Sequence, residues 1–265
     1  SASLVDLDAD HARIFWISGN EGSSDAVVAT AVFDRDRATW GPVGVAATPQ
    51  QTARDVWRSV RKVGNAVAGR APDGSLRLYY VSVSIGGWAG STINQRTSND
   101  DGQTWGPARR LAISPFMNLS TLVRNAPFAY ADGSIGLPAY HEFLAKRSEL
   151  LRLGSDGRVD DVQRIAGDRM AIQPAVLVRS PDRAIALMRN ARDVKPRHVI
   201  QADTRDGAAQ WSAARDNALL NPGSPVTGVA LPDGGLLVVA NDSQNDRRRI
   251  GLYASYDDGA SWLPL

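Results

Sequence analysis

The sequence contains no cysteine, which excludes both a disulfide framework and thiol catalysis. It also lacks any apolar run of about 18 residues, the length that a membrane-spanning helix needs. Charge of one sign is scarce too, because 30 basic residues against 28 acidic ones leave a formal net charge of +2. This balance does not favour nucleic acid as a partner, and a short basic cluster such as Arg247–Arg249 is typical of a solvated face. The N-terminal stretch SASLVDLDAD has no signal-peptide pattern, and cytoplasmic, periplasmic and secreted locations all stay open.

An aspartate-led turn followed by an apolar run recurs along the chain. Aspartate–glycine turns between alternating apolar runs predict β-hairpins, whereas helical periodicity is hard to find anywhere. The five leading residues, spaced by 50 to 63 positions, are Asp10, Asp73, Asp132, Asp182 and Asp233. Repeats of this length predict one all-β domain over residues 1–265, a β-propeller with about five four-stranded blades. Inner strands are expected near Ile14, Leu78, Gly136, Ala186 and Leu237.

Two copies of the pattern Ser-x-Asp-x-Gly-x-x-Trp occupy Ser98–Trp105 and Ser255–Trp262. Serine and aspartate side chains can accept hydrogen bonds from nearby backbone N–H groups, and glycine permits positive φ. The tryptophan is then expected to bury its ring between adjacent sheets. Weaker copies precede Trp40 and Trp211. The pattern therefore indicates a turn that locks the third strand of a blade to the fourth, and not a catalytic motif.

These turns resemble the Asp-boxes of bacterial sialidases (neuraminidases), which are six-bladed β-propellers. The phrases NLSTLVRNAPF, LPAYHEF, IQPAVLV and ALMRNARD look like the predicted-neuraminidase branch, and the resemblance covers nearly the whole chain. It implies an arginine triad that holds the substrate carboxylate, a tyrosine nucleophile activated by glutamate, and an aspartate acid/base.

The implied machinery transfers to this chain only in part. The strand Gln173–Val176 with the following Arg189 matches the family's Glu-Pro strand and its arginine, so glutamine stands where the family has glutamate. The N-terminal Arg-Ile-Pro motif is absent, and no tyrosine follows the last Asp-box. Five blades are recognisable where the resemblance implies six, and a chain that lacks the final blade would have open sheet edges that invite association.

A propeller gathers the same phase of each repeat around one axis, so polar residues at strand ends and starts are candidates for a shared site. Strand ends supply Trp88, Tyr140, Glu142, Arg189 and Asn241, and Arg248 lies close behind. Strand starts supply Asn65, Arg124 and Gln173.

Each candidate has a functional and a structural interpretation. Tyr140 and Glu142 form either a nucleophile with its base or a tyrosine hydroxyl satisfied at a strand end. Glu21 and Asp25 are either the acid/base or part of a polar turn. Arg124 and Arg189, with Arg248 as a weaker third, either grip a carboxylate or form salt bridges. Trp88 could stack on a sugar ring, whereas His141 is expected to be structural.

The sequence therefore favours a sialidase-like glycoside hydrolase that acts on acidic, sialic-acid-type glycosides. A non-catalytic glycan-binding propeller or degenerate pseudo-enzyme is the alternative, and a protein-binding scaffold is a third class. No cofactor is expected, since His11 and His198 lack metal-ligand spacing and no glycine-rich phosphate loop occurs. The expected partner is an acidic carbohydrate, and the chain is expected to be a monomer unless open sheet edges pair.

Overall fold

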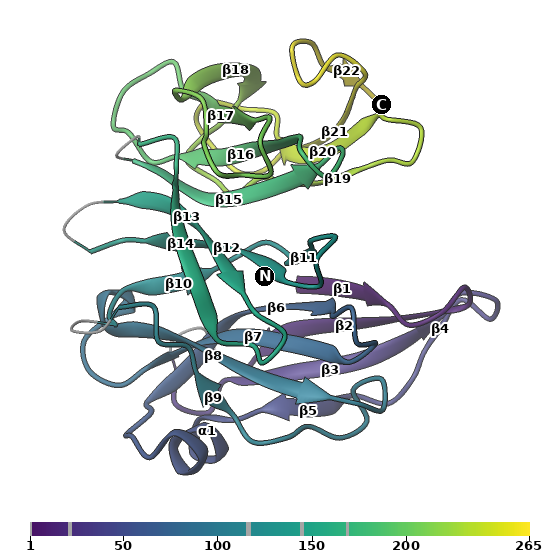
Figure 1. Cartoon of the computed structure of the whole chain (residues 1–265), viewed down its shortest axis with the longest axis vertical. Coiled ribbons are helices and arrows are strands. Elements are labelled where there is room, and N and C mark those ends of the chain that lie inside the picture. The colour runs from purple at the N-terminus through teal and green to yellow at the C-terminus, as the bar shows by residue number, and fades with distance from the viewer. Residues whose placement is uncertain (1, 21–22, 115–117, 144–145, 168–169) are drawn as a thin grey trace. The chain divides into compact units, whose positions relative to one another are not determined.

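The computed structural model describes residues 2–20, 23–114, 118–143, 146–167 and 170–265 (Figure 1). In this part of the chain, 22 strands form five sheets, and the predicted all-β class is confirmed. Two compact units are distinguished, Ser1–Leu137 with Arg152–Asp161 and Pro138–Leu151 with Val162–Leu265. Each unit is described by itself below.

The five sheets follow one another along the sequence, and strands within each sheet are ordered as they are in the chain. The first contains β1 (Ala2–Asp6), β2 (His11–Ser18), β3 (Val27–Asp34) and β4 (Thr39–Trp40), with β5 (Gly44–Ala47) also on β3. The second contains β6 (Lys62–Arg70), β7 (Leu76–Val83), β8 (Ser91–Ser98) and β9 (Arg109–Arg110). The third contains β10 (Thr121–Val123), β12 (Ile135–His141), β13 (Arg147–Leu153) and β14 (Val159–Ile165), with β11 (Phe128–Ala129) on β12.

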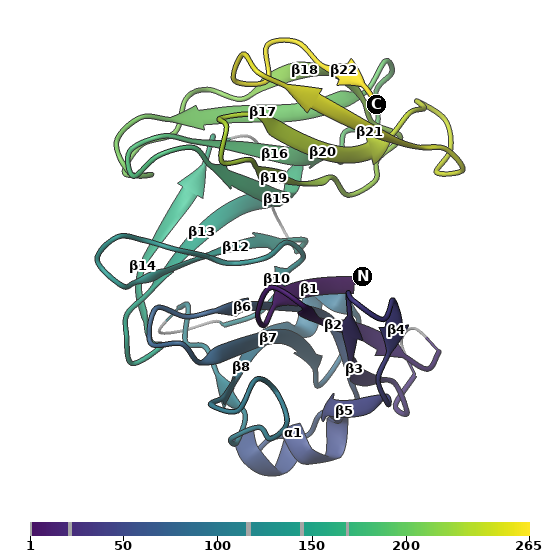
Figure 2. The same cartoon turned by 90° about the vertical axis from the view of Figure 1, so that its right-hand side faces the viewer.

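The last two sheets each have four strands. The fourth contains β15 (Ala171–Val178), β16 (Ala184–Asn190), β17 (His198–Thr204) and β18 (Arg215–Leu220). The fifth contains β19 (Thr227–Ala230), β20 (Leu236–Asn241), β21 (Ile250–Ser255) and β22 (Leu263–Pro264), which lie side by side in Figure 2. The strands expected around the five apolar runs are confirmed as β2, β7, β12, β16 and β20, each the second strand of its sheet.

One short helix, α1 (Pro49–Val56), lies in a stretch where no helical periodicity was recognised in the sequence. Thr48 caps it, since its hydroxyl accepts a hydrogen bond from the N–H of Gln51 at 3.0 Å, and proline follows at the first helical position. The helix ends at Trp57, whose backbone is left-handed with φ of 53°. Eight residues are too few to produce a recognisable helical period, but the Thr-Pro start was a usable signal.

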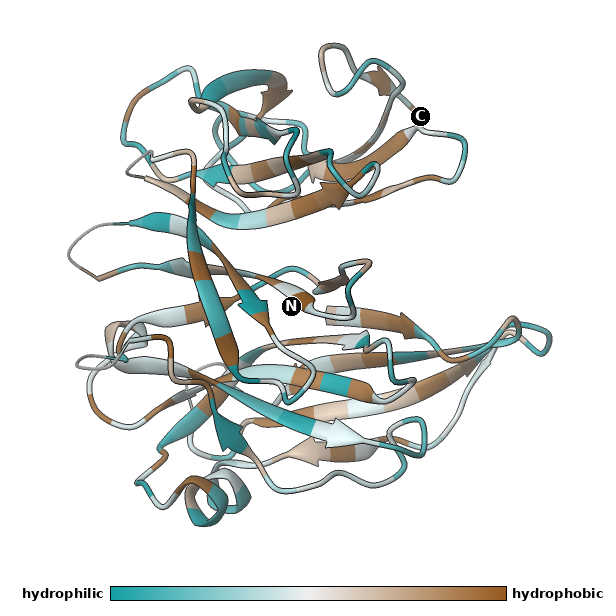
Figure 3. Cartoon of the chain, viewed as in Figure 1, coloured by the Kyte–Doolittle hydropathy of each residue, from teal (hydrophilic) through white to brown (hydrophobic). Residues whose placement is uncertain are grey.

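Apolar side chains of the strands form the buried clusters of the two units. Figure 3 shows that hydrophobic and hydrophilic residues are interspersed along the strands. In the first unit, Phe15, Leu78 and Tyr80 belong to one buried cluster. In the second, Leu187, Leu236 and Val238 belong to another. Trp105 packs against the first cluster and Trp262 against the second, which is the role predicted for the Asp-box tryptophans.

The two full Asp-boxes have the predicted hydrogen bonds. In the first, the hydroxyl of Ser98 accepts from the N–H of Gly102 at 2.7 Å, and Asp100 Oδ1 accepts from the N–H of Thr104 at 2.9 Å. The hydroxyl and N–H of Thr104, followed by Ser98, lower the pKa of Asp100 to about 2. The second box repeats these contacts through Ser255 and Asp257. The turn-lock interpretation is therefore confirmed.

The weaker copies differ from each other. In the copy at Thr204–Trp211, the Thr204 hydroxyl accepts from the N–H of Ala208 at 3.1 Å, so the turn is complete although alanine replaces glycine. Before Trp40 the turn is not reproduced, and Trp40 is 55% exposed, with its ring centroid 4.8 Å from that of Phe33. The expectation that Trp40 occupies a place similar to the other tryptophans is wrong. The serine and glycine that close the full turn are missing from this copy.

Candidate functional site

Two candidate residues, Asn65 and Gln173, lie at the same kind of backbone irregularity. Their φ values are positive, 44° and 58°. In β6 the pairing with β7 shifts between Gly64 and Val67, and in β15 the pairing with β16 shifts between Ile172 and Ala175. A β-bulge re-aims a side chain, and a left-handed non-glycine residue costs about 1–3 kcal/mol. Since the first strand of two different sheets contains this conformation, both positions are strong candidates for a functional role.

The bulge in β15 brings Gln173 to Tyr140. Gln173 Nε2 donates a hydrogen bond to the Tyr140 hydroxyl at 3.2 Å, and the two residues are 7% and 1% exposed. The contact places an amide, not a carboxylate, against the phenol. A glutamine amide cannot take up the phenolic proton at neutral pH, which a glutamate in the same position could do.

Arg189 lies on β16, half-buried, and its Cα pairs with that of Ile172, the residue before Gln173. The register of this pair therefore places Arg189 on the strand next to the bulge at Gln173. Tyr140, Gln173 and Arg189 all belong to the second unit, so the structure places these three predicted residues in one compact part of the chain.

A buried carboxylate that the sequence did not single out lies close to Tyr140 in the chain. Glu149 on β13 is 6% exposed; its Oε2 lies 2.7 Å from His141 Nε2, and its Oε1 accepts from Arg147 Nε at 2.6 Å. Burial tends to raise the pKa of Glu149, but the bonds and charges of His141 and Arg147 outweigh it and lower that pKa overall. The structural role expected for His141 is borne out by this contact. The sequence offers little signal for this site, because β13 (RSELLRL) mixes charged and apolar residues and Glu149 is one charged residue among several.

The acid/base candidates occupy loops. Glu142 follows the last residue of β12 and is half-buried, so it is just past the strand that was expected to contain it. Asp25 is exposed in the connection between β2 and β3, with its N–H 3.5 Å from the hydroxyl of Ser23. Glu21 lies outside the described residues.

In the first unit, Arg124 directly follows β10 and is half-buried. Trp88 lies on a 3-10 turn, Trp88–Gly90, and packs against β6: a Cβ on Gly64 would be 2.5 Å from its ring. The Lys62 ammonium lies 4.3 Å from the Trp88 ring centroid, within range of a cation–π interaction. Trp88 therefore packs against β6 at Lys62 and Gly64, and Asn65 is the next residue of that strand.

Asn241 and Arg248 are placed by the β20–β21 connection. Asn241 Nδ2 donates to the carbonyl of Arg249 at 2.9 Å and braces this connection. Arg248 is exposed, and its N–H bonds to Asp246 at 2.9 Å. The next strand begins at Ile250, two residues later than the sequence suggested.

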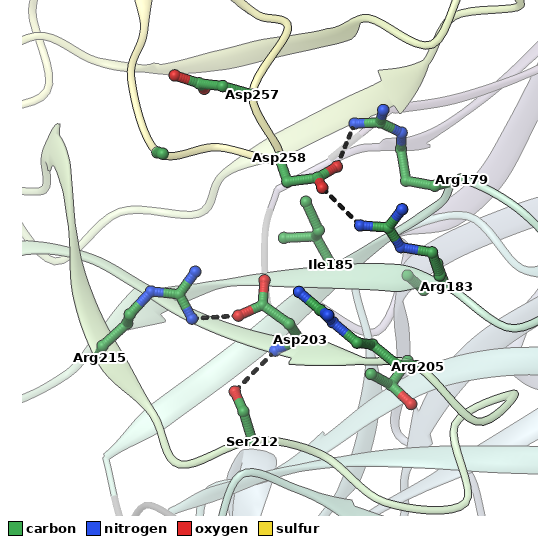
Figure 4. A pocket seen from close by; sticks show the side chains of 12 residues that line it. Arg179, Arg183, Ile185, Asp203, Arg205, Ser212, Arg215, Asp257 and Asp258 are labelled. Carbon is green, nitrogen blue, oxygen red and sulfur yellow. Dashed lines mark hydrogen bonds and ion pairs between the residues drawn. The ribbon is translucent and has the colours of Figure 1, made fainter.

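The second unit also contains a cavity of about 340 Å³ that sequence reasoning did not find (Figure 4). Arg179 and Arg183 each approach a different oxygen of Asp258 at 2.8 Å, and Arg215 pairs with Asp203. Figure 4 shows these paired groups lining the cavity. Aspartates of the fourth and fifth sheets largely neutralise the arginines that line this cavity. We therefore interpret the cluster as a structural network of ion pairs.

Among the residues that the structure describes, no group of three or more His, Asp or Glu side chains could hold a metal ion. Within the same residues, no helix has the length and apolar character needed to cross a membrane.

Comparison with known proteins connects this geometry to a family. Residues 10–265 match the family model of the BNR repeat-like domain. No curated protein sequence matches the chain.

Solved structures resemble it closely in fold and weakly in sequence. Hadza microbial sialidase Hz136 superposes with a TM-score of 0.81 at 16% identity, over 98% of this chain and 57% of that one. The NanB sialidase from Streptococcus pneumoniae gives a TM-score of 0.77 at 10% identity, over 99% and 60%. Trypanosoma rangeli sialidase in complex with sialic acid gives 0.72 at 16% identity, over 97% and 46%.

The chain thus spans less than two thirds of the length of each of these sialidases. At such identities the likeness establishes the fold alone, and the family model establishes membership because it matches almost the whole chain. The chain belongs to the BNR repeat-like domain family, and its fold is the β-propeller of the sialidases on which it superposes.

Proposed function

We propose that the chain is a sialidase-like protein that recognises an acidic, sialic-acid-type glycoside and hydrolyses it. The observation that carries the proposal is the strained bulge at Gln173, which sets that side chain against the buried Tyr140 beside the strand of Arg189. A conformation that costs free energy is retained where the surroundings require it, and a ligand site supplies such a requirement. The sialidase fold supplies the substrate class.

In this proposal Arg189 binds the sugar carboxylate by charge-assisted hydrogen bonds. Tyr140 is the nucleophile, Glu142 accepts its proton, and Asp25 or Glu21 supplies the acid/base. Arg124, Asn65, Trp88, Asn241 and Arg248 are proposed contacts for the remainder of the glycan.

A binding module without turnover is the second candidate, and one observation favours it. The group hydrogen-bonded to Tyr140 is an amide, so the contact that would activate the phenol in a glutamate-containing sialidase is absent at Gln173. Such a protein would use Arg189 in the same way and would need no proton acceptor.

Release of a fluorescent leaving group from α-linked sialosides and uronides tests the proposal. We expect turnover by the unaltered chain, and a loss of about 100-fold or more in Tyr140→Phe, because the nucleophile is removed. Glu142→Gln is expected to lose a similar factor, whereas Gln173→Glu is expected to raise turnover by supplying a carboxylate beside the phenol.

Absence of turnover in the unaltered chain and in Gln173→Glu would contradict the hydrolase. Isothermal titration with free sialic acid then decides between the remaining classes. Binding that Arg189→Ala abolishes would support the binding module, and no heat with any acidic sugar would exclude both.

A further inference from the structure

The first unit contains a cavity of about 190 Å³ that none of the predicted site residues lines. Its walls come from the segment after α1, from the ends of β7 and β9, and from the start of β8. Ile85 and Gly90, which also line it, belong to the connection that holds Trp88. The cavity therefore adjoins the segment proposed to contact the glycan, while its own side chains are different.

Two arginines, Arg58 and Arg110, line this cavity, and no carboxylate is among its described lining residues. Arg110 Nη2 donates to the carbonyl of Asn118 at 3.0 Å. Its Nε is buried without a hydrogen bond among the described residues. Burial lowers the pKa of Arg110, and the charge of Arg58 lowers it further, which places the two guanidinium groups within electrostatic reach of each other.

Like charges held together in a partly enclosed site repel unless a counter-charge is present. The end of α1 supplies a partial charge of roughly −0.5, which cannot neutralise two guanidinium groups. The contrast with the cavity of Figure 4 is direct, because Asp203 and Asp258 neutralise the arginines there. An unneutralised arginine pair is a suitable receptor for an oxyanion.

Hydroxyl groups add neutral donors to the same cavity. Ser82 Oγ accepts from Asn94 Nδ2 at 2.8 Å and lies 3.3 Å from Thr92 Oγ1. The two hydroxyls carry two hydrogens and use one between them, so the second can be donated to a bound oxygen. Ser84 also lines the cavity.

We propose that this cavity binds an oxyanion, the carboxylate or sulfate ester of an acidic sugar, through Arg58 and Arg110 with the hydroxyls of Ser82, Ser84 and Thr92. The volume suits one charged group and not a whole oligosaccharide. Because the cavity adjoins the Trp88 segment, which is a proposed glycan contact, we assign the bound group to an acidic glycan. That last step rests on the proposed function, whereas the anion site itself does not.

Titration of the ¹⁵N-labelled full chain with sodium sulfate, at ionic strength held constant with sodium chloride, tests the anion site. We expect saturable shifts of the amide signals of residues 84–90. In Arg58→Gln the sulfate concentration at half-saturation should rise by roughly tenfold, which is the effect of losing one charge-assisted contact. Arg54→Gln, an exposed arginine in the last turn of α1 that does not line the cavity, is the matched control and should leave it unchanged.

Equal sulfate titrations in the unaltered chain and in Arg58→Gln, or shifts that never saturate, would overturn the proposal. Arg58 is exposed, so its substitution keeps the test valid even where Arg110→Gln fails to fold. Arg189→Ala should leave the sulfate-induced shifts of residues 84–90 unchanged, which separates this result from the proposed function. An acidic glycan should bind the unaltered chain more tightly than its neutral counterpart, and a smaller difference between the two in Arg58→Gln would support the glycan assignment.

Discussion

At each complete Asp-box turn, two successive residues have left-handed backbone. They are Asp101 and Gly102, Gly207 and Ala208, and Asp258 and Gly259, with φ between 56° and 84°. Ala208, at 74°, is the non-glycine residue at the second of these positions. A side chain there strains the backbone without improving the hydrogen bonds of the turn.

We expect Ala208→Gly to stabilise the protein by about 0.5–1 kcal/mol, the strain relieved less the greater chain entropy of glycine when unfolded. The reverse change in the other box, Gly102→Ala, should destabilise it, since a Cβ there would be 2.7 Å from Arg13 Nε. Urea unfolding of both variants measures the difference. A destabilised Ala208→Gly would show that the methyl group's packing, at 3% exposure, outweighs the strain.

Glu149 should make the stability depend on acid. The pKa of Glu149 in the folded chain lies below the ordinary value of 4.5. Its carboxylate therefore contributes fully to the free energy of unfolding above pH 4.5, and this contribution is lost as the pH falls through the lowered folded pKa. Glu149→Gln should therefore show a flatter fall in the free energy of unfolding between about pH 5 and pH 3. Parallel profiles for the two proteins would contradict the assignment, and Asp36→Asn, at an exposed position, serves as control.

Single residues were predictable where a turn requires them. Ser98, Asp100 and Gly102 are close in sequence, so their spacing sufficed to predict the turn. Glu149 was not predicted, because its partner His141 reaches it only through the pairing of β12 with β13. A single glutamate in the sequence of a strand does not indicate which side chain of the neighbouring strand it will contact.

At the scale of elements, the strands were predicted better than the connections between them. Period-two apolar runs located β2, β7, β12, β16 and β20. The strand bulges were not predicted, although Gly64 precedes Asn65 and Pro174 follows Gln173, and glycine or proline inside a strand is a signal of a bulge. The helix α1 was not predicted, because its eight residues are too few to show a helical period.

The Asp-box turns also connect elements through their aspartates, and the two boxes differ in how strongly. Asp258 pairs with Arg179 and Arg183, and the side chain of Arg179 is only 19% exposed. Asp101 occupies the same box position and forms an ion pair with Arg70 at 2.9 Å, while Arg13 is bonded to its backbone carbonyl at 2.6 Å.

We expect Asp258→Asn to cost about 1 kcal/mol, because two arginines lose their counter-charge, one of them mostly buried. Asp101→Asn should cost less than about 0.5 kcal/mol, as for an exposed pair. Denaturant unfolding of the two variants side by side measures this. Equal costs would mean that the cavity of Figure 4 is wet enough to screen its charges.

At the scale of the whole molecule, the repeat length predicted the propeller before any site could be predicted. Strand number and order are set by patterns that recur, whereas a shared site depends on residues that meet only once in the fold. The expectation that Arg124 and Arg189 hold one carboxylate concerns a site of this kind, and it remains a prediction.

A double-mutant cycle tests that expectation. If both arginines bind the same carboxylate, Arg124→Ala and Arg189→Ala should each weaken sialic acid binding by about tenfold or more, and their effects should deviate from additivity by 0.5 kcal/mol or more. Isothermal titration of the four proteins measures the coupling. Strictly additive losses would assign the two arginines to separate ligand groups.

The bulges at Asn65 and Gln173 have a consequence for how such a chain can change. The extra residue in each bulge takes up the break in alternation, so the strand on either side keeps its own inward and outward faces whatever side chain occupies the bulge. One polar side chain, such as an amide or a carboxylate, can then replace another at the bulge position without changing how the strands of the sheet pair. The scaffold tolerates a change of chemistry there, and a hydrolase and a receptor could differ by a single residue.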